Sequence, residues 1–255
     1  MIGLLFSATM IASPPLAAEE YRAGLESRAD AAQARLHFLR AAEEFERAWN
    51  SGERNTGIAR NMAQSRFLAG DVGRAIRDYR RGLRLAPHDH ELLEGLTSVR
   101  ERISYPLASD RGSSLSPVEA SSGLDRIAVS WHRLAWGAIA LSALGWFLLA
   151  RGWRSSRREL LGLGLGSIVV AAALGGWLGW EDHRLRSHWA EPTAVVVSAT
   201  DLRTGNSEEY PRRIEVRLPA GTELRVLGER GGWLQVELPD GTTGWVSSSF
   251  VVQVD

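Results

Sequence analysis

Two long uncharged stretches in the second half of the chain constrain its fold more than any other feature. Residues 134–150 carry no charged side chain over 17 positions, and residues 160–180 carry none over 21. A helix needs about 20 apolar residues to cross the hydrocarbon core of a bilayer. Charges near the pair occur only at its ends. We therefore predict transmembrane helices at residues 129–153 and 160–180, with a pair of buried core helices as the alternative.

The ends of these stretches carry the residues that usually flank membrane spans. Tryptophan lies near the predicted ends, as in aromatic belts: Trp131, Trp153, Trp177 and Trp180. The connector at residues 154–159 belongs to an arginine-rich segment, and cytoplasmic loops are enriched in Arg. We therefore expect the connector in the cytoplasm and both terminal domains outside it. No ionisable residue lies within either stretch, which argues against a transporter or a proton relay.

Small residues recur at four-residue spacing in the second stretch. Gly162 is followed by Gly166, and Gly175 by Gly179. This spacing lets helix backbones approach closely. We expect it to pack the two spans on each other, and a homodimer face is the alternative.

The N-terminus has the pattern of an export signal. An apolar run of residues 2–12 leads to small residues ending at Ala18, after which the chain becomes charged. The run is too short to span a bilayer and fits a signal peptide at residues 1–18. Its first residues carry no arginine, so an uncleaved anchor or a wrongly assigned start residue is the alternative. An exported N-terminus agrees with the orientation derived from the basic connector.

Composition excludes several classes of protein. The 30 basic residues, all of them arginine, balance 30 acidic ones, so a broad nucleic-acid-binding face is not expected. The chain has no cysteine, which excludes disulfides, thiolate zinc sites and cysteine nucleophiles. Lysine is also absent, which excludes Schiff-base chemistry and the lysine of a nucleotide-binding P-loop.

Residues 19–103 predict an all-α domain, because apolar residues recur there with helical spacing on one side. Gly70-Asp71 breaks the pattern, small Ala75 allows helices to cross, and Pro87 ends a helix. The spacing resembles a tetratricopeptide (TPR) repeat. Its signature and candidate groove residues are Arg66, Gly70, Ala75, Tyr79 and Pro87.

The TPR resemblance implies that the helical region binds a protein or peptide in a groove around Tyr79 and Arg66. Only one repeat is complete, and Gly82 stands where alanine is expected. A generic small helical bundle is therefore the alternative. Residues 104–128, rich in serine, predict a flexible linker to the membrane, and residues 181–192 a second linker.

Residues 193–255 predict a small β barrel, because the hydrophobic period changes to two and Asp240-Gly241 is a strong hairpin signal. The segment closely resembles a bacterial SH3 (SH3b) domain, and its most specific marks are Trp233, Gly244 and Trp245. The resemblance implies binding of cell-wall peptides or proteins, with these residues as candidate groove. A purely structural role for both tryptophans stays open.

The chain lacks the motifs of common enzymes, so we predict no catalytic residue, cofactor or metal. His88 and His90 flank Asp89, and we interpret Asp89 as a helix cap rather than part of a metal site. The arginine-rich residues 80–84 are expected to form a solvated helix face, with a phosphate or acidic-partner site as the alternative.

Together these features predict a multidomain membrane protein: an all-α TPR-like region, two transmembrane helices and a small all-β SH3b barrel. This order resembles BatE-type proteins of aerotolerance (Bat) operons. The resemblance implies a bacterial inner-membrane location and partnership with von Willebrand A proteins and a MoxR-type AAA+ ATPase. We expect a non-enzymatic scaffold that binds partner proteins in the periplasm. The alternative is a cell-envelope tether or sensor that binds peptidoglycan through SH3b.

Overall fold

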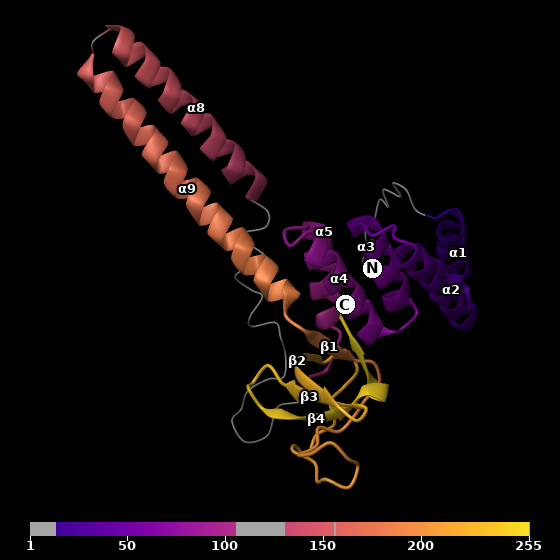
Figure 1. Ribbon diagram of the computed structural model, residues 1–255. Helices are drawn as coiled ribbons and strands as arrows, with labels where there is room; N and C mark the ends of the chain where they lie inside the picture. Colours follow the sequence, from indigo (N-terminus) through magenta and orange to yellow (C-terminus); the bar gives the residue numbers. More distant parts are fainter. Residues whose placement is uncertain (1–13, 106–130, 156, 255) are drawn as a thin grey trace. The chain divides into compact units, whose positions relative to one another are not determined.

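The computed structural model describes residues 14–105, 131–155 and 157–254 (Figure 1). The described residues form two compact units. One unit contains residues 14–105, here called the helical domain, together with residues 191–254, which include the β domain at 193–254. The other contains the helices of residues 131–190.

The helical domain is all-α, as predicted. Its elements are α1 (Pro15–Glu26), η1 (Ser27–Ala29), α2 (Ala31–Asn50), α3 (Thr56–Leu68), α4 (Val72–Leu85) and α5 (His90–Arg100). A side-chain oxygen accepts a backbone N–H at the start of each helix from α2 to α5, and the caps are Asp30, Asn55, Asp71 and Asp89. Asp89 thus has the capping role expected of it, and its Oδ1 lies 3.2 Å from the amide nitrogen of Leu92.

The helix break predicted at Gly70-Asp71 separates α3 from α4. Gly70 has a φ of +82°, a left-handed conformation that costs little only for glycine. Gly82 departs from the TPR pattern for a visible reason. A Cβ there would lie 2.8 Å from Leu92 Cδ1 and 3.0 Å from the Cβ of Ala59, so glycine lets α4 approach both α3 and α5.

The predicted signal peptide lies mostly outside the described residues, which begin at Pro14. Helix α1 runs through the predicted cleavage region, and Ala17 is fully buried in a core shared with Phe38 and Phe45 of α2. Cleavage after Ala18 would remove the first turn of α1. The signal peptide itself stays a prediction, as does the linker at 104–128, of which only Ser104 and Tyr105 are described.

The β domain holds a five-stranded antiparallel sheet of order β4-β3-β2-β1-β5. Its strands are β1 (Thr193–Val196), β2 (Glu223–Arg230), β3 (Trp233–Glu237), β4 (Thr243–Ser247) and β5 (Val251–Gln253), with η2 (Ser248–Phe250) before the last. The expected alternation is confirmed, because Leu234, Val236 and Leu238 all lie in the core. Gly241, with a φ of +83°, turns the hairpin between β3 and β4 as Asp240-Gly241 predicted.

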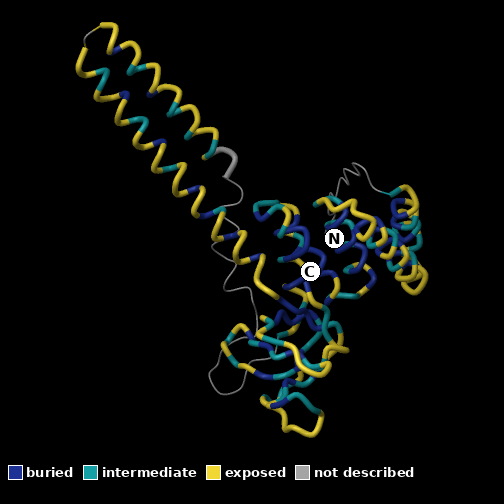
Figure 2. Tube along the Cα trace, in the orientation of Figure 1, coloured by how far each residue is buried: buried dark blue, intermediate teal, exposed yellow. Residues whose placement is uncertain are grey.

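The second unit contains α8 (Trp131–Ser155) and α9 (Arg158–Ala190), which run side by side (Figure 1). Both helices are long and apolar enough to cross a membrane, and most of their residues are exposed (Figure 2). Their bounds correct two predictions. The helices extend into the predicted connector, and residues 181–190 continue α9 instead of forming a linker. No Pro or Gly interrupts the chain there before Pro192, and Asp182 pairs with Arg186 one turn later, at 2.8 Å.

The glycine pairs do not pack the two helices on each other, contrary to expectation. A Cβ at Gly162, Gly166, Gly175 or Gly179 would meet nothing within 4 Å. The close approach uses other glycines: a Cβ at Gly145 would lie 2.6 Å from Ser167 Oγ, and one at Gly164 would lie 2.9 Å from Leu149 Cγ. Periodicity identified small residues on the helix, but the relative rotation of α8 and α9 determines which of them meet.

Candidate binding surfaces

The outward face of β3 and β4 carries the two tryptophans of the SH3b signature. Leu234 and Val236 of β3 point into the core, so the alternating residues Trp233 and Gln235 point outward. Gln235 lies opposite Trp245 in the register, which makes Trp233 and Trp245 diagonal neighbours on one face. Both indole side chains are half-buried and keep surface open to solvent. The face thus presents two aromatic rings to a ligand.

Gly244 has a structural role in this face. It is buried, and a Cβ there would lie 2.6 Å from Leu202 Cγ and 2.9 Å from the carbonyl oxygen of Arg203. Glycine therefore lets residues 198–218 lie against β4, where Arg203 and Trp245 form an antiparallel bridge. Gly244 was predicted as a candidate groove residue, and the structure shows it buried where it admits this loop.

Sequence reasoning missed further exposed apolar side chains of the β domain. Leu227, Tyr210 and Phe250 are 46%, 48% and 38% exposed. Phe250 belongs to η2, which is held beside the β2–β3 turn because the amide and the hydroxyl of Ser248 both donate to the Gly232 carbonyl, at 2.9 and 2.8 Å. Leu227 lies at a register irregularity of β2. For Leu227 the available signal was an apolar residue within a strand, whereas Tyr210 and Phe250 lie outside the strands and carried no such signal.

Four of the five TPR signature residues are buried in the helical domain, and Gly70 is exposed. Ala75 is fully buried, and Tyr79 is 5% exposed with its ring against Gly95 of α5, where a Cβ would collide with it. Arg66 is 5% exposed and binds two carboxylates, Asp78 at 2.7 Å and Glu46 at 2.6 Å. A partner could not reach Tyr79 or Arg66 without displacing this packing. The predicted groove around them is therefore not where the structure offers a surface, and these residues stabilise the fold.

The prediction of a solvated helix face at the arginine-rich residues 80–84 is wrong for two of its arginines. Arg80 and Arg81 were expected on a solvated face but are 6% and 7% exposed. Arg80 Nη1 lies 2.5 Å from Glu223 Oε2, and its Nη2 lies 2.9 Å from Thr193 Oγ1. Glu223 and Thr193 belong to the β domain, so this part of α4 faces a domain that follows it by more than a hundred residues.

Glu223 is the centre of the contact between the helical and β domains. Arg100 of α5 donates to it from Nε at 2.6 Å and from Nη2 at 2.9 Å, beside the bond from Arg80. Burial by itself raises the pKa of the Glu223 carboxyl, but Arg100 and Arg80 outweigh burial and hold that pKa at about 2. Glu223 is therefore ionised in the folded protein and neutralises part of the charge that these arginines bring into the interior.

Close backbone packing completes this contact. A Cβ at Gly73 of α4 would collide with the carbonyl oxygen of Val196 in β1, and one at Gly221 would collide with Ile103. Tyr105, at the end of the helical domain, packs against the apolar core of the β domain. The helical domain and the β domain are thus parts of one body, whereas the sequence indicated two separate modules.

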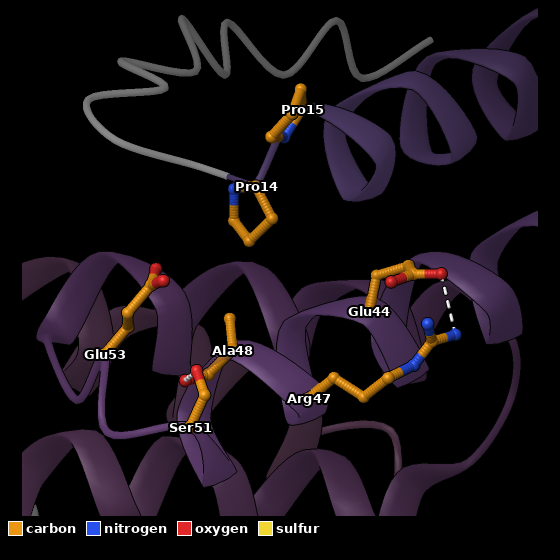
Figure 3. A pocket seen from close by; sticks show the side chains of 7 residues that line it. All are labelled: Pro14, Pro15, Glu44, Arg47, Ala48, Ser51 and Glu53. Atoms are coloured by element: carbon orange, nitrogen blue, oxygen red, sulfur yellow. Dashed lines mark hydrogen bonds and ion pairs between the residues drawn. The ribbon is translucent and has the colours of Figure 1, made fainter.

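A further pocket opens between the start of α1 and the end of α2 (Figure 3). Its lining residues are Pro14, Pro15, Glu44, Arg47, Ala48, Ser51 and Glu53. Arg47 is paired with Glu44 at 2.7 Å, so its charge is compensated within the pocket. Among the residues that the structure describes, no group of three or more His, Asp or Glu side chains could hold a metal ion.

Comparison with known families supports the β domain alone. The bacterial SH3 domain family matches residues 198–252. Strand β1 begins five residues before this match and pairs with both β2 and β5, so the sheet extends beyond it to Thr193. No curated protein and no solved structure matches the chain. Residues 198–252 are therefore similar to a bacterial SH3 domain, which agrees with the resemblance that the sequence indicated.

Proposed function

We propose that this protein is a non-enzymatic, membrane-anchored binding protein whose SH3b domain binds cell-wall peptides outside the cytoplasm. The observation that carries the proposal is the pair of half-buried tryptophans, Trp233 and Trp245, on one outward face of β3 and β4. Half-buried aromatic side chains supply large contact area at little entropic cost, and tryptophan is enriched among the residues that dominate binding energy.

Binding to the wall can be measured directly on the full-length protein in a mild non-ionic detergent. Purified peptidoglycan sacculi are mixed with the protein and sedimented, and the bound fraction gives the affinity. We expect Trp233→Ala and Trp245→Ala each to weaken binding by about tenfold, the effect of losing roughly 1.4 kcal/mol of contact. Trp153→Ala is the matched control, because that tryptophan is 84% exposed but lies on α8.

Two results would contradict the proposal. One is a wild-type protein that does not sediment with sacculi. The other is equal binding by the wild type and by all three tryptophan variants.

The contact between the helical and β domains also supports a specific membrane topology. Arg80 and Arg100 come before α8, and Glu223 comes after α9, yet these three side chains form one buried cluster. Two parts of a chain can meet in this way only if they lie on the same side of the membrane. If α8 and α9 both cross it, they return the chain to the starting side and leave the arginines at residues 151–158 on the other. The positive-inside rule assigns that other side to the cytoplasm.

The absence of cysteine makes this topology straightforward to test. Single cysteines replace Ser51, Ser155 or Ser249, all exposed, and a membrane-impermeant maleimide is applied to intact and to permeabilised spheroplasts. We expect Ser51→Cys and Ser249→Cys to react in spheroplasts, and Ser155→Cys to react only after permeabilisation. Opposite labelling of Ser51→Cys and Ser249→Cys would contradict the topology.

A second candidate function is the scaffold of a Bat-type system, with von Willebrand A proteins and a MoxR-type ATPase as partners. The order of helical region, two apolar helices and SH3b domain favours it. Affinity purification of the full-length protein from its native membrane, followed by mass spectrometry, distinguishes the two candidates. Recovery of those proteins, dependent on Trp245 and independent of added wall fragments, would favour the scaffold.

A further inference from the structure

A group of charged side chains lies beside the outward face of β3 and β4 that carries Trp233 and Trp245. Residues 198–218 run along β4 there. The Arg203 amide donates to the Trp245 carbonyl at 2.9 Å, and the Trp245 amide donates to the Arg203 carbonyl at 2.8 Å. Directly opposed residues of an antiparallel pair place their side chains on the same face. Leu202 is fully buried on the core side, so Arg203 shares the outward face with Trp245.

Backbone pairing extends this face to further residues. Arg212 lies opposite Arg203 in a second antiparallel bridge, and Asp201 lies two residues before Arg203, so both share its face. Arg212 Nη2 lies 3.1 Å from Asp201 Oδ2, and Arg217 Nε lies 3.3 Å from Asp201 Oδ1. Arg203 Nη2 lies 3.8 Å from the same carboxylate. These four residues, here called the Asp201 cluster, continue the outward face from Trp245.

The Asp201 cluster carries more positive charge than it neutralises. Three guanidinium groups surround one carboxylate, and the Asp201 side chain is 13% exposed. Glu208, Glu209 and Glu215 belong to the same loop, but none of them forms an ion pair with these arginines in the described structure. The cluster therefore presents a net positive charge beside Trp245.

The arginines of the cluster divide into two roles. Arg203 Nη1 donates to the carbonyls of Glu208 and Tyr210, at 2.7 and 2.8 Å, so Arg203 positions the loop. Arg212 and Arg217 have side chains that are 53% and 58% exposed. Arg217 Nη2 also donates to the Ala199 carbonyl at 3.0 Å, so Arg217 is held against the loop while much of its side chain stays open to solvent. Arginine presents a planar set of donors that matches the geometry of a carboxylate.

We propose that Arg212 and Arg217 bind free carboxylates of a peptide whose remaining part lies on Trp233 and Trp245. This inference rests on the proposed peptide-binding function and adds the chemical class of the ligand, an acidic peptide. Charge complementarity carries the choice of ligand. An outward face with two aromatic rings and an adjacent excess of guanidinium groups fits a chain that combines contact area with negative charge.

The test compares two forms of one probe. A fluorescein-labelled wall stem tetrapeptide with free carboxylates is titrated with the full-length protein in non-ionic detergent, and its anisotropy is recorded. The same tetrapeptide with every carboxylate converted to an amide is titrated in parallel. We expect the wild type to bind the acid form about fivefold more tightly, the effect of exposed charge pairs of up to about 1 kcal/mol. The preference should decrease at high salt.

The double variant Arg212→Gln/Arg217→Gln should bind both forms with the affinity that the wild type has for the amide form. Unchanged binding of the amide form shows that this variant is folded. Arg74→Gln is the matched control, since its side chain is 49% exposed and paired one-to-one with Asp71 at 2.8 Å, and it should keep the preference.

The other possible outcomes contradict either the role of the Asp201 cluster or the proposed peptide-binding function. Equal binding of both forms by the wild type, or a preference that persists in the double variant, would overturn the role of the Asp201 cluster alone. Failure of the wild type to bind either form would overturn the proposed peptide-binding function, and this inference with it.

Discussion

Replacing Glu223 with alanine is expected to lower the free energy of unfolding of the helical and β domains by about 3–5 kcal/mol, the usual cost of removing one partner from a buried ion pair. The variant leaves Arg80 and Arg100, 6% and 5% exposed, without the carboxylate that both now bind. Pulse proteolysis of the full-length protein in urea measures the change.

Glu237→Ala is the control for this prediction. Glu237 also belongs to the β domain and pairs with an arginine, Arg225 at 3.3 Å, but both side chains reach solvent. Its removal should cost less than about 1 kcal/mol. Equal effects of the two variants would show that Glu223 does not hold the helical and β domains together.

Replacing Tyr79 with alanine is expected to cost about 3–5 kcal/mol of stability, because it leaves a cavity between α4 and α5. The ring is 5% exposed and lies against Gly95. Because glycine has no side chain, nothing at position 95 can fill the space that the ring leaves. Tyr79→Phe keeps the ring and should cost less than about 1.5 kcal/mol. Pulse proteolysis again gives the free energies.

The Tyr79 variants also decide between two roles for this residue. The TPR resemblance predicts a groove residue, whose loss would reduce partner recovery in a folded protein. Its burial predicts a core residue, whose loss would destabilise the helical domain. A Tyr79→Ala protein of normal stability that recovers no partner would show that the interpretation from burial is wrong.

Patterns within a few residues predicted most elements of the fold. Gly70-Asp71 separated two helices and Asp240-Gly241 formed a hairpin, because positive φ angles and side-chain caps act over one turn of chain. Alternation identified the core residues of β3 for the same reason, since neighbouring side chains of a strand point to opposite faces. The helix of residues 181–190 was missed because polar, charged residues were interpreted as a linker although nothing in them ends a helix.

The candidate surfaces were predicted only in part. Trp233 and Trp245 were identified from their positions around glycine turns, and alternation places them on the outward face. The Asp201 cluster was not foreseen, because it depends on bridges that bring Arg203 beside both Trp245 and Arg212. Arg66 and Tyr79 were placed in a groove by family spacing, but the packing of α2, α4 and α5 buries them.

The sequence by itself determined the local character of each segment: two apolar helices, a helical domain with its breaks, and strands with one apolar face. Only the tertiary structure decided which faces meet. Arg80 and Glu223 are separated by 143 positions, and no periodicity indicates that an arginine on a helix will be buried by a strand from the other end of the chain. The same is true of Gly145 and Gly164, which pack α8 on α9 while the more regularly spaced glycines do not. Local patterns reflect the geometry of one turn or one strand, whereas a buried charge or a close helix crossing depends on the partner surface across it.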